Sequence, residues 1–126
     1  MNILLVEDDP TDGKLLTAVL NSSGHRVLET STAEQAEEAI KRRHPEAILL
    51  DLKLPGIDGL ELARRLKADA DTRHIPIVAI TAARETYSRD AALAAGCDGF
   101  IVKPVDTRKL SDQILNVAVP PPPEKE

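Results

Sequence analysis

The sequence predicts an α/β protein in which a five-stranded parallel sheet forms the middle layer of a three-layer αβα sandwich. Five short runs of strand-forming residues alternate with five segments of helical spacing. None of the runs alternates cleanly between apolar and polar residues, a pattern typical of strands that helices cover on both faces. Because parallel strands need right-handed crossovers, repeated βα units give an open sheet with helices on either side.

The predicted strands are short. Four are apolar runs at residues 3–6, 47–50, 75–80 and 100–102, and a weaker one occupies residues 26–30. Helical spacing of apolar residues predicts helices around residues 15–20, 33–40, 60–66 and 91–95, and a last helix from 107 to 117. Together these elements describe the doubly wound (βα)5 arrangement of flavodoxin-like folds.

Capping residues indicate several helix boundaries. Asp9, which precedes a proline, is typical of an N-cap followed by proline at the first helical position. Ser31 and Glu34 have the spacing of a capping box before the second helix. Gly24 and Gly96 stand where helix-ending glycines are expected.

The length of 126 residues predicts one domain, at residues 1–118, followed by a proline-rich tail at 119–126 that is either a terminus or a linker stub. The single Cys97 cannot form an internal disulfide, which favours a reduced, cytoplasmic setting. No apolar run approaches the roughly 20 residues needed to cross a bilayer, so no membrane partner is expected. A net charge of −5, with Tyr87 and Phe100 as the aromatic residues, argues against direct nucleic-acid binding.

Polar side chains stand where several predicted strands end. Glu7 and Asp8 follow the first strand, and Asp51 ends the third. Thr81 follows the fourth strand, and Lys103 follows the fifth. Ligands of an open parallel sheet bind outside the carboxyl ends of its strands. We therefore expect these five side chains to share one edge.

Such a cluster of acids needs positive charge. Two carboxylates about 4 Å apart repel by roughly 4 kcal/mol at an effective dielectric constant near 20. Lys103 can offset one charge, and a group of two or three carboxylates also suits Mg²⁺. Magnesium held by carboxylates beside Lys103 and the Thr81 hydroxyl favours phosphoryl transfer, with Asp51 as the nucleophile.

At these residues the sequence resembles the receiver domain of two-component response regulators, over residues 2 to about 117. The same fold is shared by the chemotaxis and single-domain cell-cycle regulators. The resemblance rests on four motifs in order, each at a strand end: ILLVEDDP at 3–10, LLDLKLPGIDG at 49–59, ITA at 80–82 and VKP at 102–104.

The resemblance implies a phosphoacceptor and a metal site. Asp51 is the implied phosphoacceptor and also a ligand of Mg²⁺. Asp8 is the implied direct ligand, and Glu7 reaches the metal through water. The backbone carbonyl of Lys53 completes the protein ligands.

The resemblance also implies a switch. The Thr81 hydroxyl moves toward the phosphoryl group while the Phe100 ring turns inward. Lys103 bonds a phosphoryl oxygen, and its peptide bond to the following proline is cis. The positions that control phosphoryl lifetime are Lys53 and Ala83, two residues after the acceptor and two after the switch hydroxyl.

The primary hypothesis is therefore a single-domain response regulator in a phosphorelay. It takes a phosphoryl group on Asp51 from the phosphohistidine of a sensor histidine kinase or phosphotransfer protein. It then contacts a downstream protein through the fourth helix, fifth strand and fifth helix, as a monomer or a phosphorylation-dependent dimer. On this hypothesis the chain is not an enzyme, because it catalyses only its own phosphorylation and dephosphorylation.

Three alternatives stay open at this point. The chain can be a receiver domain cut from a longer regulator with a C-terminal effector. A phosphatase or phosphotransferase with an aspartyl-phosphate intermediate is weaker, because such enzymes usually carry a second acid two residues after the nucleophile, where this chain has Lys53. A flavodoxin-like cofactor binder is weaker still, because the sequence shows neither the hydroxyl-rich phosphate loop nor the aromatic flanks of a flavin site.

Overall fold

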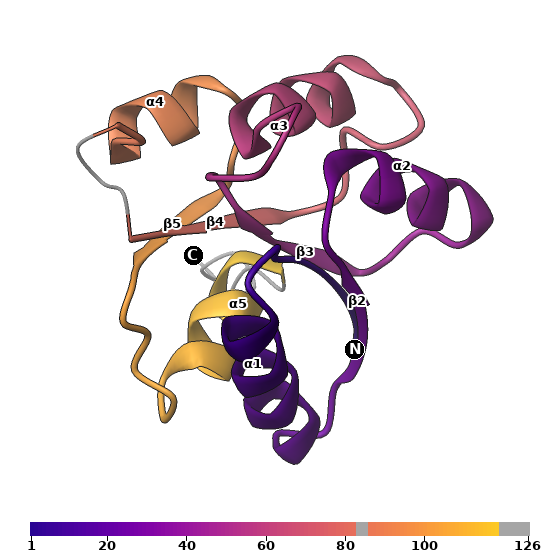
Figure 1. Ribbon diagram of the computed structural model, residues 1–126. Coiled ribbons are helices and arrows are strands. Elements are labelled where there is room, and N and C mark those ends of the chain that lie inside the picture. Colours follow the sequence, from indigo (N-terminus) through magenta and orange to yellow (C-terminus); the bar gives the residue numbers. More distant parts are fainter. Residues whose placement is uncertain (83–85, 119–126) are drawn as a thin grey trace, which may run out of the picture.

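The computed structural model describes residues 1–82 and 86–118 and contains five βα units (Figure 1). In chain order the elements are β1 (Asn2–Val6), α1 (Pro10–Ser22), β2 (Arg26–Thr30), α2 (Ala33–Arg42), β3 (Ala47–Asp51), α3 (Gly59–Ala68), β4 (Ile77–Thr81), α4 (Arg89–Ala94), β5 (Gly99–Val102) and α5 (Leu110–Ala118). Within the described ranges, no helix combines the length and apolar composition needed to span a membrane.

The five strands form one sheet in the order β2-β1-β3-β4-β5, and every neighbouring pair is parallel. Figure 1 shows α1 and α5 on one face of this sheet and α2, α3 and α4 on the other. The predicted fold class, a doubly wound αβα sandwich, is therefore confirmed. The predicted proline-rich tail at 119–126 lies outside the described residues.

The core lies on both faces of the sheet, and all residues of β3 and β4 are buried. Successive side chains of a strand point to opposite faces. Leu4 and Leu50 accordingly pack in the cluster beneath α2, α3 and α4, whereas Leu5 and Leu49 pack in the cluster beneath α1 and α5. This two-sided burial explains why these strands read as continuous apolar runs.

The N-cap prediction is confirmed for α1 and displaced by one residue for α2. The Asp9 side chain accepts hydrogen bonds from two backbone N–H groups in the first turn of α1. The α2 cap is Thr32, not Ser31: its hydroxyl accepts from the Gln35 N–H at 3.1 Å. The Gln35 side chain returns to the Ser31 N–H at 2.8 Å. Ser31 with Glu34 and Thr32 with Gln35 have the same spacing, so spacing alone does not distinguish them.

Two elements begin later than predicted. β4 begins at Ile77 rather than at residue 75, because Pro76 has no N–H to donate to a neighbouring strand. α5 begins at Leu110 rather than at residue 107. Residues 107–109 form a turn in which the backbone N–H groups of Lys109 and Leu110 both donate to the Asp106 carbonyl.

The register of the sheet places the carboxyl ends of β1, β3 and β4 at one edge. Val6 pairs with Leu50, and Asp51 pairs with Ile80. Glu7 therefore leaves β1 beside the residue that ends β3. Residues far apart in the sequence meet here because parallel strands all end in the same direction.

α3 approaches the backbone that carries Asp51 very closely at Gly59. A Cβ atom added to Gly59 would lie 2.5 Å from the Asp51 carbonyl oxygen and 2.7 Å from the Leu52 Cα. The Gly59 N–H donates to the Leu52 carbonyl at 2.9 Å. The missing side chain thus lets the start of α3 support the end of β3.

We predict that Gly59→Ala lowers the free energy of unfolding by about 1–3 kcal/mol, because the new methyl group displaces the backbone of Asp51 and Leu52. Gly13→Ala is the matched control, since an added Cβ there meets nothing closer than 3.8 Å. Replacing a glycine by alanine inside a helix stabilises a protein by about 0.5–1 kcal/mol, so we expect Gly13→Ala to raise the free energy of unfolding. Urea unfolding followed by circular dichroism measures both variants. Equal stability of Gly59→Ala and wild type would contradict the close approach.

Candidate functional site

Three of the predicted acids converge at the carboxyl edge of the sheet. Glu7 and Asp8 follow β1, and Asp51 ends β3. One carboxylate oxygen from each lies within 4.8 Å of the others. Glu7 and Asp51 are buried, and Asp8 is exposed. The prediction that these acids meet is confirmed, and their oxygen donors suit a hard divalent cation such as Mg²⁺.

Lys103 lies against the acids, as its position after β5 predicts. Its Nζ donates to Glu7 Oε2 at 3.1 Å and to Asp51 Oδ2 at 3.2 Å. It also donates to Asp12 Oδ2 at 3.0 Å. Lys103 is the one cationic side chain in contact with these acids among residues 1–82 and 86–118.

Asp12 was missed by the sequence analysis, which considered only residues directly after a strand. It lies in the first turn of α1 and therefore at the same edge of the sheet as the end of β1. A signal for it was present, because an acid in the first turn of a helix that follows a strand end points back toward that edge. Asp12 contacts Lys103 but is not part of the group of three acids that could hold a metal.

The electrostatics of the site reflect the burial of its charged groups and the closeness of its acids. Burial, a hydrogen bond with Asp51 and the negative charge of Asp51 raise the pKa of Glu7 to about 8, and the opposing effect of Lys103 does not cancel them. Burial acts to lower the pKa of Lys103, but the hydrogen bond to Asp12 and the charges of Asp51 and Glu7 raise it above its ordinary value. A divalent cation would supply the charge that the acids lack.

The acidic side chains line a hollow in the protein surface of about 440 Å³. Lys53 lines it, and its backbone N–H donates to Asp51 Oδ1 at 3.0 Å. The Lys53 N–H and the Lys103 ammonium therefore each donate to a different carboxylate oxygen of Asp51. The residues that line the hollow are Glu7, Asp8, Asp9, Asp12, Asp51, Lys53, Ala82 and Lys103.

Thr81 ends β4 next to the site and is fully buried. Its backbone carbonyl accepts from the Lys103 N–H at 2.9 Å, and the Lys103–Pro104 bond is cis, as the resemblance implied. Phe100 lies in β5, is partly buried and packs against the core cluster beneath α4. Ala83, named for phosphoryl lifetime, lies outside the described residues.

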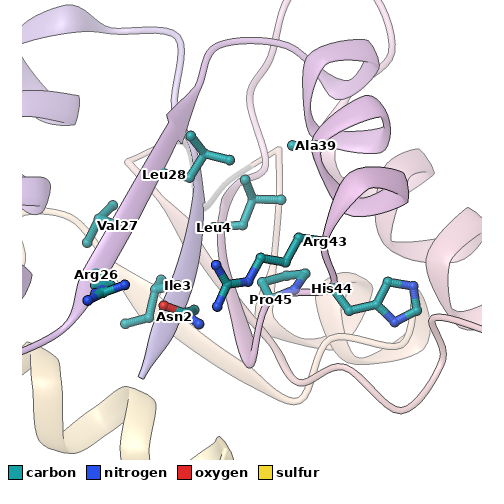
Figure 2. A pocket seen from close by; sticks show the side chains of 10 residues that line it. All are labelled: Asn2, Ile3, Leu4, Arg26, Val27, Leu28, Ala39, Arg43, His44 and Pro45. Carbon is teal, nitrogen blue, oxygen red and sulfur yellow. The ribbon is translucent and has the colours of Figure 1, made fainter.

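A second hollow, of about 270 Å³, lies away from the acids (Figure 2). It is bordered by the start of β1, the edge strand β2 and the end of α2. Leu4 and Leu28 contribute apolar surface, and Arg26 and Arg43 lie among the side chains that line it. None of the ten lining residues carries a carboxylate, so this hollow lacks the chemistry of the acidic site.

The chain is similar to known signalling proteins. The family described as the response regulator receiver domain matches residues 3–115. The phosphate regulon transcriptional regulatory protein PhoB of Pseudomonas aeruginosa is 41% identical over 108 residues, which are 86% of this chain and 47% of PhoB. The chain thus spans about half the length of that relative. The polar-differentiation response regulator DivK of Brucella ovis is 31% identical over 113 residues, 90% of this chain and 92% of DivK.

Solved structures agree with these relatives. The receiver domain of a sensor histidine kinase from Pseudomonas aeruginosa, with magnesium coordinated in its active-site cleft, has a TM-score of 0.85 and 33% identity, covering 93% of this chain and 96% of that one. The BeF3-activated receiver domain of RstA from Klebsiella pneumoniae also has a TM-score of 0.85, at 31% identity, covering 94% and 99%. With the fold, the acidic site and the family match in agreement, this chain belongs to the response regulator receiver domains of two-component signalling.

Proposed function

We propose that this receiver domain is a phosphorelay switch that accepts a phosphoryl group on Asp51 from the phosphohistidine of a histidine kinase or phosphotransfer protein. The observation that carries the proposal is the position of the Asp51 carboxylate. It lines an open hollow, beside two further acids and in contact with the Lys103 ammonium. A carboxylate that faces an open hollow can act as a nucleophile.

In this proposal Asp8, Asp51 and the Lys53 backbone carbonyl would bind Mg²⁺, and Glu7 would contribute through a bound water. When bound, the ion would neutralise charge on the phosphoryl oxygens. The grouping of the three acids and the magnesium in a similar receiver domain support this assignment.

The chain's own residues then orient the transfer. The Lys53 N–H and the Lys103 ammonium each hold one oxygen of Asp51. An Asp51 oxygen forms a bond to phosphorus as the bond from phosphorus to the donor nitrogen breaks, and the electron pair of that bond leaves with the histidine. Lys103 then binds a phosphoryl oxygen in a charge-assisted hydrogen bond.

We further propose that the phosphoryl group is read through Thr81 and Phe100. Thr81 ends β4 beside the site, and Phe100 lies on the neighbouring strand β5. Movement of the Thr81 hydroxyl toward the phosphoryl group makes room for the ring. The new bonds favour a second arrangement of the face formed by α4, β5 and α5, which contacts a downstream protein or a second copy. Lys53 and Ala83 set how long the phosphoryl group persists.

The proposal describes a single-domain regulator that modifies only itself and acts in the cytoplasm. The match to nearly all of DivK supports this organisation. The match to less than half of PhoB supports the alternative, a receiver domain of a longer regulator. A phosphatase that releases phosphate from many substrates is weaker, because Lys53 stands where such enzymes usually place a second acid.

We predict that wild-type protein incubated with Mg²⁺ and a small acyl phosphate gains the mass of one phosphoryl group, whereas Asp51→Asn gains none. The amide of asparagine is not a nucleophile that can replace the carboxylate. Asp58→Asn is the matched control, because Asp58 caps α3 by accepting the Glu61 N–H at 2.9 Å and asparagine caps equally well. Intact-protein mass spectrometry measures the gain. Equal phosphorylation of Asp51→Asn would overturn the assignment.

We predict that Lys103→Met raises the affinity for Mg²⁺ by roughly tenfold, because the ammonium competes with the cation for the same carboxylates. Lys53→Met is the control. It removes the same charge from the same hollow, while the structure shows only the Lys53 backbone bonded to the acids. Isothermal titration calorimetry is expected to show a smaller increase in Mg²⁺ affinity for Lys53→Met than for Lys103→Met. Weaker Mg²⁺ binding by Lys103→Met would contradict the competition.

A further inference from the structure

Lys103 contacts three carboxylates, and one of them, that of Asp12, has no role in the proposed function. An ammonium has three N–H donors. Here they serve Glu7 at 3.1 Å, Asp12 at 3.0 Å and Asp51 at 3.2 Å. The shortest of these contacts goes to Asp12, for which the transfer to Asp51 provides no role.

The local structure of α1 directs Asp12 to this contact. Asp12 is the third residue of the helix after the cap Asp9. In a capping box, a Glu or Gln at this position turns back to the backbone N–H of the cap. In this protein the Asp9 N–H donates to Glu7 Oε1 at 3.3 Å instead. The Asp12 carboxylate is therefore left to pair with Lys103.

The three partners of Lys103 differ in how easily they can release it. The side chains of Glu7 and Asp51 are 1% and 6% exposed, whereas that of Asp12 is 41% exposed. A buried carboxylate that loses its cation is left charged and poorly solvated, which is costly. An exposed one is rehydrated, so breaking the pair costs little. Asp12 is thus the partner that Lys103 can most easily exchange for another anion.

We propose that Asp12 is a positioning residue that restrains phosphorylation: it holds Lys103 in the unphosphorylated protein and must release it when the ammonium binds the incoming phosphoryl group. This inference rests on the proposed function. Once Asp51 is phosphorylated, Lys103 is bound to the phosphoryl group both before and during hydrolysis. Asp12 therefore slows the gain of the phosphoryl group without changing the rate of its loss.

The test compares the rates of phosphorylation by a small acyl phosphate and of hydrolysis, both at saturating Mg²⁺. We expect Asp12→Ala to be phosphorylated about two- to fivefold faster than wild type, in line with the strength of an exposed ion pair. Asp12→Asn, which keeps a hydrogen-bond acceptor, is expected to be phosphorylated at a rate between those of wild type and Asp12→Ala. Asp12→Glu, which keeps the carboxylate, is expected to be phosphorylated as slowly as wild type. Hydrolysis stays within about twofold of wild type in all three variants.

The variant Asp9→Asn distinguishes the effect of the Asp12–Lys103 contact from the effect of removing one negative charge near the site. It removes one negative charge from the same hollow, keeps a side chain that can cap α1, and makes no contact with Lys103. We expect it to accelerate phosphorylation less than Asp12→Ala does. Equal acceleration by Asp9→Asn would overturn the proposal in favour of a general charge effect. An equal change in the phosphorylation and hydrolysis rates of Asp12→Ala would overturn it as well.

A measurement on Lys103 itself does not depend on phosphorylation. Nitrogen-15 NMR of the lysine ammonium groups is expected to show faster proton exchange with water at Lys103 in Asp12→Ala than in wild type. Equal exchange in the two proteins would show that Asp12 does not hold the ammonium. If wild type is not phosphorylated at all, the proposed function fails and the restraint fails with it, while faster exchange would still show that Asp12 holds Lys103.

Discussion

The convergence of several carboxylates on one ammonium is the interaction on which the rest of this structure depends. Glu7 and Asp51 are buried side by side, Asp8 and Asp12 flank them, and Lys103 lies among them. One positive charge does not balance this set, and burial, together with the neighbouring Asp51, raises the pKa of Glu7. The site therefore suits a divalent cation such as Mg²⁺, which would supply the missing positive charge.

The fold makes this imbalance tolerable. Strand pairing from β1 through β3 and β4 to β5 holds the backbones beside Glu7, Asp51 and Lys103 in fixed register, so these backbones cannot separate to relieve the repulsion of the acids. Gly59 lets α3 press against the backbone of Asp51 and Leu52, which supports the end of β3 from the side of the following loop. The stability of the apolar core thus offsets the electrostatic cost of the site.

Much of this arrangement could be predicted from the sequence, because strand ends are easy to recognise in it. Apolar runs followed by Glu7, Asp51 and Lys103 predicted both the sheet and the meeting of these residues. Asp12 was missed by that reasoning because it does not directly follow a strand; its place in the first turn of α1 indicates the right edge of the sheet, but its contact with Lys103 also depends on the rotation of the helix. The cap of α2 was misplaced by one residue because two adjacent residue pairs satisfy the same spacing.

The central claim is that Glu7, Asp8 and Asp51 form one cation site at the carboxyl edge of the sheet. It is tested most directly by the anomalous scattering of Mn²⁺ soaked into crystals of the protein, since Mn²⁺ favours the same oxygen ligands as Mg²⁺. Our account predicts one strong peak in contact with the carboxylates of Asp8 and Asp51. A map with no peak there, or with the ion bound only elsewhere on the molecule, would contradict it.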